Sequence, residues 1–267
     1  MLSFIRSLGN RAIHTRMTHY VSIANQKVPI TGSTPEILNK VLKFQPFKDW
    51  IQTFNKQPNE MNIHSIEIQS TDIFGSSKLG FVKFKADVRY KETGKNAPGI
   101  VFMRGGSVAV LIILKSEGKN TEDKVILTVQ PRIAVPSLEF PELPAGMLDG
   151  SGQFSGVAAK EIEEETGLII KDDELIDLTE LAYGTSWRGV YPSAGGSDEF
   201  LRLFVCHKTL SQSDINELEG KLTGLRDHGE NITLKLVDLK DAWKCAPDSK
   251  LLSTLALYDA LKRENLV

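Results

Sequence analysis

The 267-residue sequence has little of several features that would assign it to a class of protein. It has only two cysteines, Cys206 and Cys245, and they suggest neither a disulfide framework nor a zinc site, which favours a reducing compartment. The formal net charge is −2, whereas nucleic-acid-binding domains are usually basic. The longest apolar runs, such as Val108–Leu114, are far shorter than the roughly 20 residues that cross a bilayer. We therefore expect neither a nucleic-acid partner nor a membrane-spanning segment.

Acidic residues are absent from the first part of the chain until Glu36, while Arg6, Arg11 and Arg16 occur there. An acid-poor, arginine-bearing and weakly amphipathic start is typical of an organellar transit peptide. The alternative is an N-terminus that is simply disordered. We predict targeting over residues 1–30, to the mitochondrion, with the chloroplast as an alternative. A start at Met17 would give a cytoplasmic form.

The next part of the sequence, residues 31–98, predicts helices followed by a small sheet. Thr34–Asn55 is helical in pattern, with an N-cap and a proline at its start, and Pro46 is expected to divide it. The apolar period changes to two over Ile63–Tyr90, which predicts an antiparallel sheet. Glu92–Gly99 has the composition of a turn or linker, so we place a domain boundary between residues 98 and 99.

Residues 99–267 mix strand and helix patterns around one sheet system, which predicts an α+β fold or an α/β sandwich. Gly167 stands where a left-handed helix cap is wanted. The helices are expected at Phe154–Thr166 and Ser249–Leu266, and the strands at Ser107–Leu114, Lys124–Gln130, Leu168–Ile170, Leu178–Tyr183, Leu201–Val205 and Ile232–Val237.

Three acidic side chains of the helix at Phe154–Thr166 fall on one face. Glu161, Glu164 and Glu165 are three and four residues apart, a spacing at which like charges cost an isolated helix about 0.2–0.5 kcal/mol per pair. They also lie near the C-terminus of the helix, where its dipole disfavours anions. A solvated acidic face is one reading. A bound divalent cation with oxygen ligands, such as Mg²⁺, is the other, and it would offset these costs.

The surrounding residues decide between these readings. The stretch from Gly146 to Leu168 resembles the Nudix box, Gly-x5-Glu-x7-Arg-Glu-U-x-Glu-Glu-x-Gly-U, in which U is a bulky apolar residue. Two positions depart from it: Gly152 replaces the first glutamate and Lys160 replaces the arginine, a pair that in the family braces the loop against the helix. The resemblance implies an α/β/α Nudix sandwich following the N-terminal sheet. The matching residues are Gly146, Glu161, Ile162, Glu164, Glu165, Gly167 and Leu168.

Outside the box, residues 99–264 also resemble the ADP-ribose and ADP-sugar pyrophosphatases. Within this group the sequence is similar above all to the plant-type organellar ADP-sugar diphosphatases. The motifs that carry it are Gln130-Pro131-Arg132, Glu142-Leu143-Pro144-Ala145-Gly146, the loop Pro192–Glu199 and the loop Gly224–Glu230. In the loop Pro192–Glu199, alanine replaces the second proline of the family pattern, and the preceding segment Thr185–Val190 resembles an insertion. This group cleaves the diphosphate of ADP-sugars to AMP and a sugar phosphate.

The resemblance implies a metal site. Its ligands would be Glu161, Glu164 and Glu165 with the backbone carbonyl of Ala145, and its ion Mg²⁺, for which Mn²⁺ can substitute.

The residue that activates the attacking water stays open in this sequence. Glu164, Glu199 and Glu230 are the candidates, because His228 replaces a glutamate credited with that role in bacterial members.

The remaining site residues concern the substrate and a second subunit. The resemblance implies that Arg132 contacts the phosphates, and position in the sequence suggests that Trp187, or alternatively Tyr191, stacks on the adenine. Members of the group exchange an N-terminal strand region in a homodimer, so Arg89 or Arg104 is expected to reach the partner's site.

Two other functions stay open. One is hydrolysis of UDP-glucose or another nucleoside diphosphate derivative. The other is a Nudix module that binds a nucleotide without cutting it, which the departures at Gly152 and His228 would permit. A panel of nucleotide sugars with Mg²⁺ separates the three.

Overall fold

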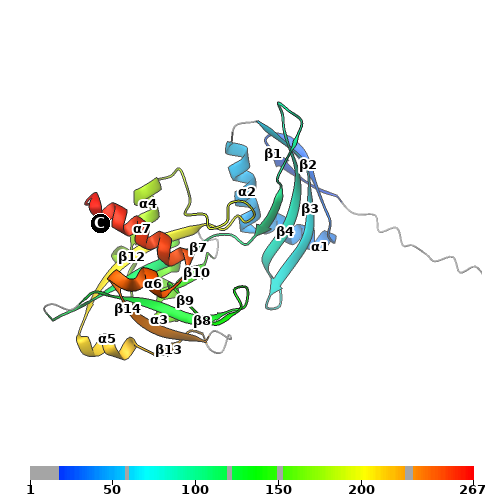
Figure 1. The fold of residues 1–267 in the computed structure, drawn as a ribbon. Helices are drawn as coiled ribbons and strands as arrows, with labels where there is room; N and C mark the ends of the chain where they lie inside the picture. Colours follow the sequence, from blue (N-terminus) through cyan, green and yellow to red (C-terminus); the bar gives the residue numbers. More distant parts are fainter. Residues whose placement is uncertain (1–17, 58–59, 119–121, 149–152, 226–230) are drawn as a thin grey trace, which may run out of the picture. The chain divides into compact units, whose positions relative to one another are not determined.

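The computed structural model describes residues 18–57, 60–118, 122–148, 153–225 and 231–267 (Figure 1). The chain forms two compact units, Met1–Met103 and Arg104–Val267. The boundary lies slightly later than the expected one between residues 98 and 99. The difference arises because β6 (Ile100–Met103) pairs with β4 and so belongs to the N-terminal sheet.

The first unit is a six-stranded sheet with two helices. The sheet has the order β1-β2-β3-β4-β5, with β6 also pairing with β4. All pairs are antiparallel except β2 with β3, which are parallel. Its elements are β1 (His19–Ile23), β2 (Gln26–Thr31), α1 (Pro35–Lys43), α2 (Gln45–Lys56), β3 (Met61–Phe74), β4 (Lys78–Tyr90) and β5 (Asn96–Ala97).

The two helices confirm the division of the first helical pattern. The Thr34 side chain accepts a hydrogen bond from the Ile37 amide, so it caps α1, and Pro46 lies in the first turn of α2. Apolar residues of both helices, such as Leu38 and Phe47, are fully buried against strand residues such as Phe84. One face of the first sheet therefore supports the core of this unit.

Part of the segment 1–30, expected to be a transit peptide or disordered, has regular structure. His19–Ile23 and Gln26–Thr31 form β1 and β2, with Val28 and Ile30 in the core. A lack of acids does not prevent strand pairing, and Val21, Ile23, Val28 and Ile30 have the period of two that is typical of a strand. The part of the targeting prediction before Thr18 lies outside the described residues.

The second unit is built on an eight-stranded mixed sheet with the order β11-β12-β7-β8-β14-β13, in which β10 also pairs with β7 and β9 with β8. β12 and β7 are parallel, and the other pairs are antiparallel. Its strands are β7 (Ser107–Ser116), β8 (Lys124–Arg132), β9 (Ser137–Glu142), β10 (Ala145–Met147), β11 (Ile176–Asp177), β12 (Leu201–Leu210), β13 (Leu222–Thr223) and β14 (Ile232–Asp238).

Helices cover both faces of this sheet (Figure 1). Alternate residues of β7 enter two separate cores: Leu111 packs with α7 residues such as Leu251, and Ile112 packs with α3 residues such as Ile162. The predicted α/β/α sandwich is confirmed. The helices are α3 (Phe154–Thr166), α4 (Leu178–Tyr183), α5 (Gln212–Leu218), α6 (Ala242–Cys245) and α7 (Ser249–Arg263), with short 3-10 turns η1 (Asp172–Glu174) and η3 (Leu239–Asp241).

Two expected strands of this unit are wrong. Leu178–Tyr183 is the helix α4, whose N-cap Asp177 accepts a hydrogen bond from the Glu180 amide at 2.8 Å. Leu168–Ile170 has no regular secondary structure. Both were short apolar runs, for which periodicity does not separate strand from helix or coil.

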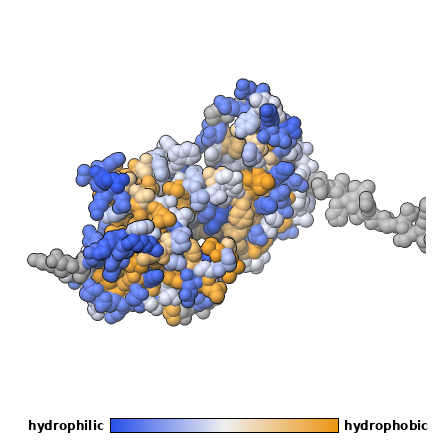
Figure 2. Space-filling model, viewed as in Figure 1, coloured by the Kyte–Doolittle hydropathy of each residue, from blue (hydrophilic) through white to orange (hydrophobic). Residues whose placement is uncertain are grey.

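The surface mixes hydrophobic and hydrophilic residues in each unit (Figure 2). The turn between β8 and β9 exposes the apolar side chains of Ile133 and Val135. Within the described residues, no helix is long and apolar enough to cross a membrane.

Candidate active site

The acidic helix of the Nudix-like stretch is α3, and it has the predicted bounds. Gly167 ends it in the left-handed conformation at φ 76°, and its amide donates to the Glu163 carbonyl at 2.9 Å. Glycine suits this position because a side chain would be strained there. The helix therefore stops directly after its run of glutamates.

Glu161 lies against the strand β10. A Cβ atom added to Gly146 would stand 1.8 Å from the carboxyl carbon of Glu161, so only glycine leaves room for this side chain. β10 pairs with β7, the centre of the sheet, with Gly146 opposite Val108. The requirement for glycine at this place in the sequence pattern thus has a steric cause.

Glu165 is the buried acid of the helix, with 6% of its surface exposed. Its Oε2 accepts a hydrogen bond from the Ala145 amide at 2.9 Å. Burial raises the pKa of Glu165 to about 8, and the charges of Glu161 and Glu142 add to the rise, while the Ala145 amide and Arg132 oppose it. Arg132 supplies some positive charge to the Glu165 carboxylate, but not enough to offset the effect of burial on its pKa.

Glu164 lies on the same helix and forms an ion pair with Lys160 at 3.5 Å between Nζ and Oε1. The Lys160 side chain is 71% exposed. Among the described residues, its ion-pair partner therefore lies on the surface of the same helix. Gly152, the other departure from the family pattern, lies outside the described residues.

Arg132, predicted to contact phosphates, sits beside a second buried carboxylate. Its Nε donates to Glu142 Oε1 at 2.6 Å, and Lys250 Nζ donates to Glu142 Oε2 at 2.7 Å. Lys250 also contacts Asp248, which caps α7 and accepts the Leu143 amide at 3.1 Å. This network fixes the Nε edge of Arg132 and leaves the side chain 42% exposed, so the rest of its guanidinium can meet a ligand.

The loop Pro192–Glu199 meets the start of the second unit. Asp198 accepts hydrogen bonds from the Arg104 and Gly105 amides, at 2.8 Å for Arg104. Glu199 forms an ion pair with Arg104 at 3.3 Å. Burial raises the pKa of Asp198, and the two amides work against that rise. Glu199 thus holds Arg104 in this structure, and the two predicted residues come together.

Trp187 is 60% exposed in the segment read as an insertion. Its ring meets Tyr191 edge-on at 5.9 Å between centroids, and Tyr191 in turn contacts Phe200 at 6.4 Å. An exposed ring that is supported from one side presents an apolar face to a planar ligand.

A divalent metal ion requires oxygen donors of the kind that α3 supplies. Among the described residues, no three His, Cys, Asp or Glu side chains already converge on one point. Glu165 is nonetheless a buried acid whose charge is disfavoured by burial and by the neighbouring charge of Glu161. A cation between these two carboxylates would offset both effects, and Gly146 leaves the room in which the Glu161 carboxylate lies. The residues present therefore fit Mg²⁺.

Three further residues from the sequence analysis are not part of the arrangement that the structure describes. Arg89 belongs to the first unit, where it pairs with Asp87 at 3.1 Å. Glu230 and His228 lie outside the described residues.

Sequence reasoning missed the roles of Glu142, Asp248 and Lys250. Asp248 was readable, because an aspartate directly before a helical pattern is a common N-cap. Lys250 also carried a signal: a lysine in the first turn of a helix is unfavourable in the dipole field unless a carboxylate partners it. That the partner is Glu142 could not be read, since 108 residues separate the two.

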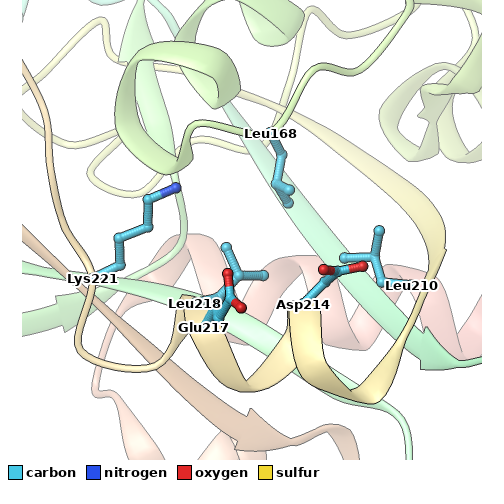
Figure 3. Close-up of a pocket in the computed structure, with 6 residues that line it drawn as sticks. All are labelled: Leu168, Leu210, Asp214, Glu217, Leu218 and Lys221. Atoms are coloured by element: carbon cyan, nitrogen blue, oxygen red, sulfur yellow. The ribbon is translucent and has the colours of Figure 1, made fainter.

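A separate pocket of about 320 Å³ lies by the C-terminal end of α3 (Figure 3). Leu168, Leu210 and Leu218 form its apolar part, and Asp214, Glu217 and Lys221 stand around it. The α3 glutamates do not line it.

Comparison with known proteins bears on this site directly. The family model described as NUDIX domain matches residues 103–255, more than half of the chain and the whole acidic helix. The chain belongs to the Nudix family.

This Nudix protein is 40% identical over 227 residues to "Nudix hydrolase 14, chloroplastic" of Arabidopsis thaliana, a match that covers 83% of this chain and 72% of that protein. Among solved structures, one titled "Crystal structure of ADP compounds hydrolase" is similar with a TM-score of 0.47 and 15% identity, over 77% of this chain and 99% of that one. The family assignment makes this chain a Nudix hydrolase with a mixed α and β fold.

Proposed function

We propose that this Nudix hydrolase cleaves the diphosphate bond of ADP-sugars, ADP-ribose and ADP-glucose among them, to AMP and a sugar phosphate in the presence of Mg²⁺. The observation that carries the proposal is how the two acids of α3 lie. Glu161 packs against Gly146, and Glu165 accepts a hydrogen bond from the Ala145 amide. The positive charge of Arg132 acts on the buried carboxyl of Glu165. Acids and an arginine around one point suit a diphosphate together with a cation.

Each protein group has a defined task in this proposal. The cation would be held by Glu161, Glu164, Glu165 and the Ala145 carbonyl. Arg132 places fixed positive charge at the phosphates, since Glu142 holds its Nε edge in position. When bound, Mg²⁺ offsets negative charge on the diphosphate and makes water more acidic.

The base that takes the proton from water is chosen from Glu164, Glu199 and Glu230. Glu199 and Glu164 each form an ion pair, with Arg104 and Lys160 respectively. Glu230 is the first candidate to test, because its loop resembles the one that supplies a late acidic residue to the metals or the attacking water. A Glu230→Gln variant should lose most turnover while it still binds the nucleotide, whereas Glu199→Gln should mainly raise KM.

The substrate class is tested with purified protein, Mg²⁺ and a panel of nucleotide sugars. AMP release from ADP-sugars supports the proposal, and preferential UMP release from UDP-glucose would redirect it to another nucleoside diphosphate derivative. Tight binding of an ADP-sugar without turnover would indicate a non-catalytic nucleotide-binding module. The wild type with EDTA in place of Mg²⁺ is the control, and Mn²⁺ should restore activity.

We also propose a homodimer formed through the first unit. Its sheet exposes Ile100 and Phe102 on the edge strand β6, and an exposed apolar edge favours pairing with a second copy. Arg89 is the candidate for reaching the partner's substrate. Light scattering should give twice the chain mass, and Arg89→Ala should raise KM in the dimer without changing its mass.

An organellar location is part of the proposal. The acid-poor segment before Glu36 predicts it, and the similar Arabidopsis protein is named as chloroplastic. Our prediction is the mitochondrion, with the chloroplast as the alternative. Fusing residues 1–35 to a fluorescent protein tests it: uptake by either organelle supports targeting, and a diffuse cytoplasmic signal contradicts it.

A further inference from the structure

Phe200 lies at the point where four segments around the candidate site meet. It is 4% exposed and directly precedes β12. A Cβ atom on Gly106 would stand 2.2 Å from its ring, so the ring packs closely against that backbone. The Gly106 carbonyl accepts a hydrogen bond from the Leu148 amide at 3.0 Å, and Leu148 belongs to the run that leads from β10 toward α3.

The ring of Phe200 also meets the first residue of α3. Phe154 contacts it edge-on, with 6.5 Å between centroids. The guanidinium of Arg202 also lies 4.9 Å from the centroid of the Phe154 ring. The start of the helix that carries the glutamates is therefore held by an aromatic contact and a cation–π contact.

Arg202 is itself immobilised. It is 7% exposed, and it donates from its edge to Asp177 at 2.6 Å and to Glu180 at 2.8 Å. A guanidinium can bond through its edge and stack through its face at the same time, which lysine cannot do. Phe154 thus packs against a cation that two carboxylates hold in place.

The segment read as an insertion reaches the same ring. The Arg188 guanidinium lies 4.4 Å from the centroid of Phe200, and the Arg188 carbonyl accepts from Arg202 at 3.4 Å. Val190 exchanges backbone hydrogen bonds with Leu201, at 3.0 and 2.8 Å. The loop that bears Trp187 and the start of α3 are therefore attached to one aromatic residue.

We propose that Phe154 and Phe200, with Arg188 and Arg202 over their rings, form an aromatic brace that positions α3 against the substrate loop. The inference rests on the proposed function for its catalytic consequence. An ion pair between positions 152 and 160 does not do this work here, because glycine has no side chain and Lys160 pairs with Glu164 at the helix surface. Phe154 and Phe200 are positioning residues that act through Glu161 and Glu165.

The brace is tested with Phe154→Leu and Phe200→Leu, which remove the rings and keep apolar side chains. Tyr258→Leu is the matched control: it removes a buried ring from the core on the other face of the same sheet. Hydrogen exchange of the α3 amides Val157–Lys160 is measured without metal or nucleotide. We expect exchange at least tenfold faster in both phenylalanine variants and unchanged in Tyr258→Leu.

Two further readouts separate positioning from general stability. Mn²⁺ affinity should weaken several-fold in both phenylalanine variants, and kcat should fall about tenfold with KM within twofold of wild type, because misplaced ligands act on the chemical step. The exposed Arg188→Gln variant, which leaves the core unchanged, should show the same pattern more weakly.

One outcome overturns the brace. In it, both phenylalanine variants have a lower Tm, as Tyr258→Leu does, but the hydrogen exchange of their α3 amides and their Mn²⁺ affinity equal those of wild type. If instead the wild type cleaves no nucleotide sugar, the proposed function fails, while the exchange measurement still decides on the brace.

Discussion

Two glutamates of the second unit are almost equally buried, but they differ in how many cationic side chains they contact. Glu142 is 2% exposed and receives two cationic partners, Arg132 at 2.6 Å and Lys250 at 2.7 Å. Glu165 is 6% exposed, and its described hydrogen-bond partner is the Ala145 amide. Charge at Glu142 is therefore balanced within the protein, whereas burial leaves Glu165 with a pKa of about 8.

From this contrast we propose that Glu142 is structural and that Glu165 binds a cation. A buried carboxylate without a cation is costly in a folded protein, and proteins retain such groups mainly at functional sites. The next tests alter one acid or its partner at a time.

The largest effect is expected at the uncompensated acid. Glu165→Gln removes a charged ligand, so we expect turnover of an ADP-sugar to fall by about a thousandfold or more. Glu163→Gln on the exposed face of the same helix is the control and should keep wild-type turnover. AMP release measures both, and comparable activity in the two variants would remove Glu165 from the mechanism.

The balanced acid should respond in stability. Lys250→Met leaves the buried carboxylate of Glu142 with one cationic partner. We expect the free energy of unfolding to fall by about 3 kcal/mol. Lys240→Met breaks an exposed pair with Glu122 and should leave the urea midpoint unchanged. Equal midpoints for the two variants would show that the Glu142 network is not needed for the fold.

Arg132 connects the two acids, and its substitution should affect catalysis more than folding. Arg132→Lys keeps the charge but loses the planar fork that binds Glu142 and a phosphate together. We expect kcat/KM to fall about 30-fold, or roughly 2 kcal/mol of transition-state binding. A fall of less than threefold, measured on the best substrate of the panel, would place Arg132 outside the site.

The pKa of Glu165 gives a pH test of stability without metal. Because its folded pKa is raised to about 8, the folded state keeps a proton that the unfolded chain loses above about pH 4.5. Stability of wild type should therefore fall as pH rises from about 4.5 to 8. In EDTA, Glu165→Gln should gain on the order of 5 °C in Tm over wild type between pH 5 and pH 9. A constant difference across that range would mean that Glu165 is ionised throughout.

The smallest effect concerns Trp187, which is far more exposed than either acid. If it stacks on the adenine, Trp187→Ala should raise KM about fivefold at unchanged kcat. Tyr191→Phe keeps the supporting ring and serves as the control. An unchanged KM in Trp187→Ala would mean that the base binds elsewhere.

The sequence predicted local features well. The bounds of α3 and its cap at Gly167 follow from residues close together in the chain, whereas the α/β/α sandwich was implied by the resemblance to the Nudix family. The contacts of Glu142 with Lys250 and of Phe154 with Phe200 could not be predicted, because each joins two segments that lie far apart in the sequence. Leu178–Tyr183 was misread for a related reason: its helical state depends on the Asp177 cap and on burial of Thr179 beneath β12.

The central claim is that the acidic face of α3 exists to hold a divalent cation. Titration of the protein with Mn²⁺, without nucleotide and at pH 8.5, tests it in wild type, Glu164→Gln/Glu165→Gln and Glu163→Gln. We expect saturable binding in wild type and Glu163→Gln and a loss of at least tenfold in affinity in the double variant. Equal affinity in all three proteins would contradict the account.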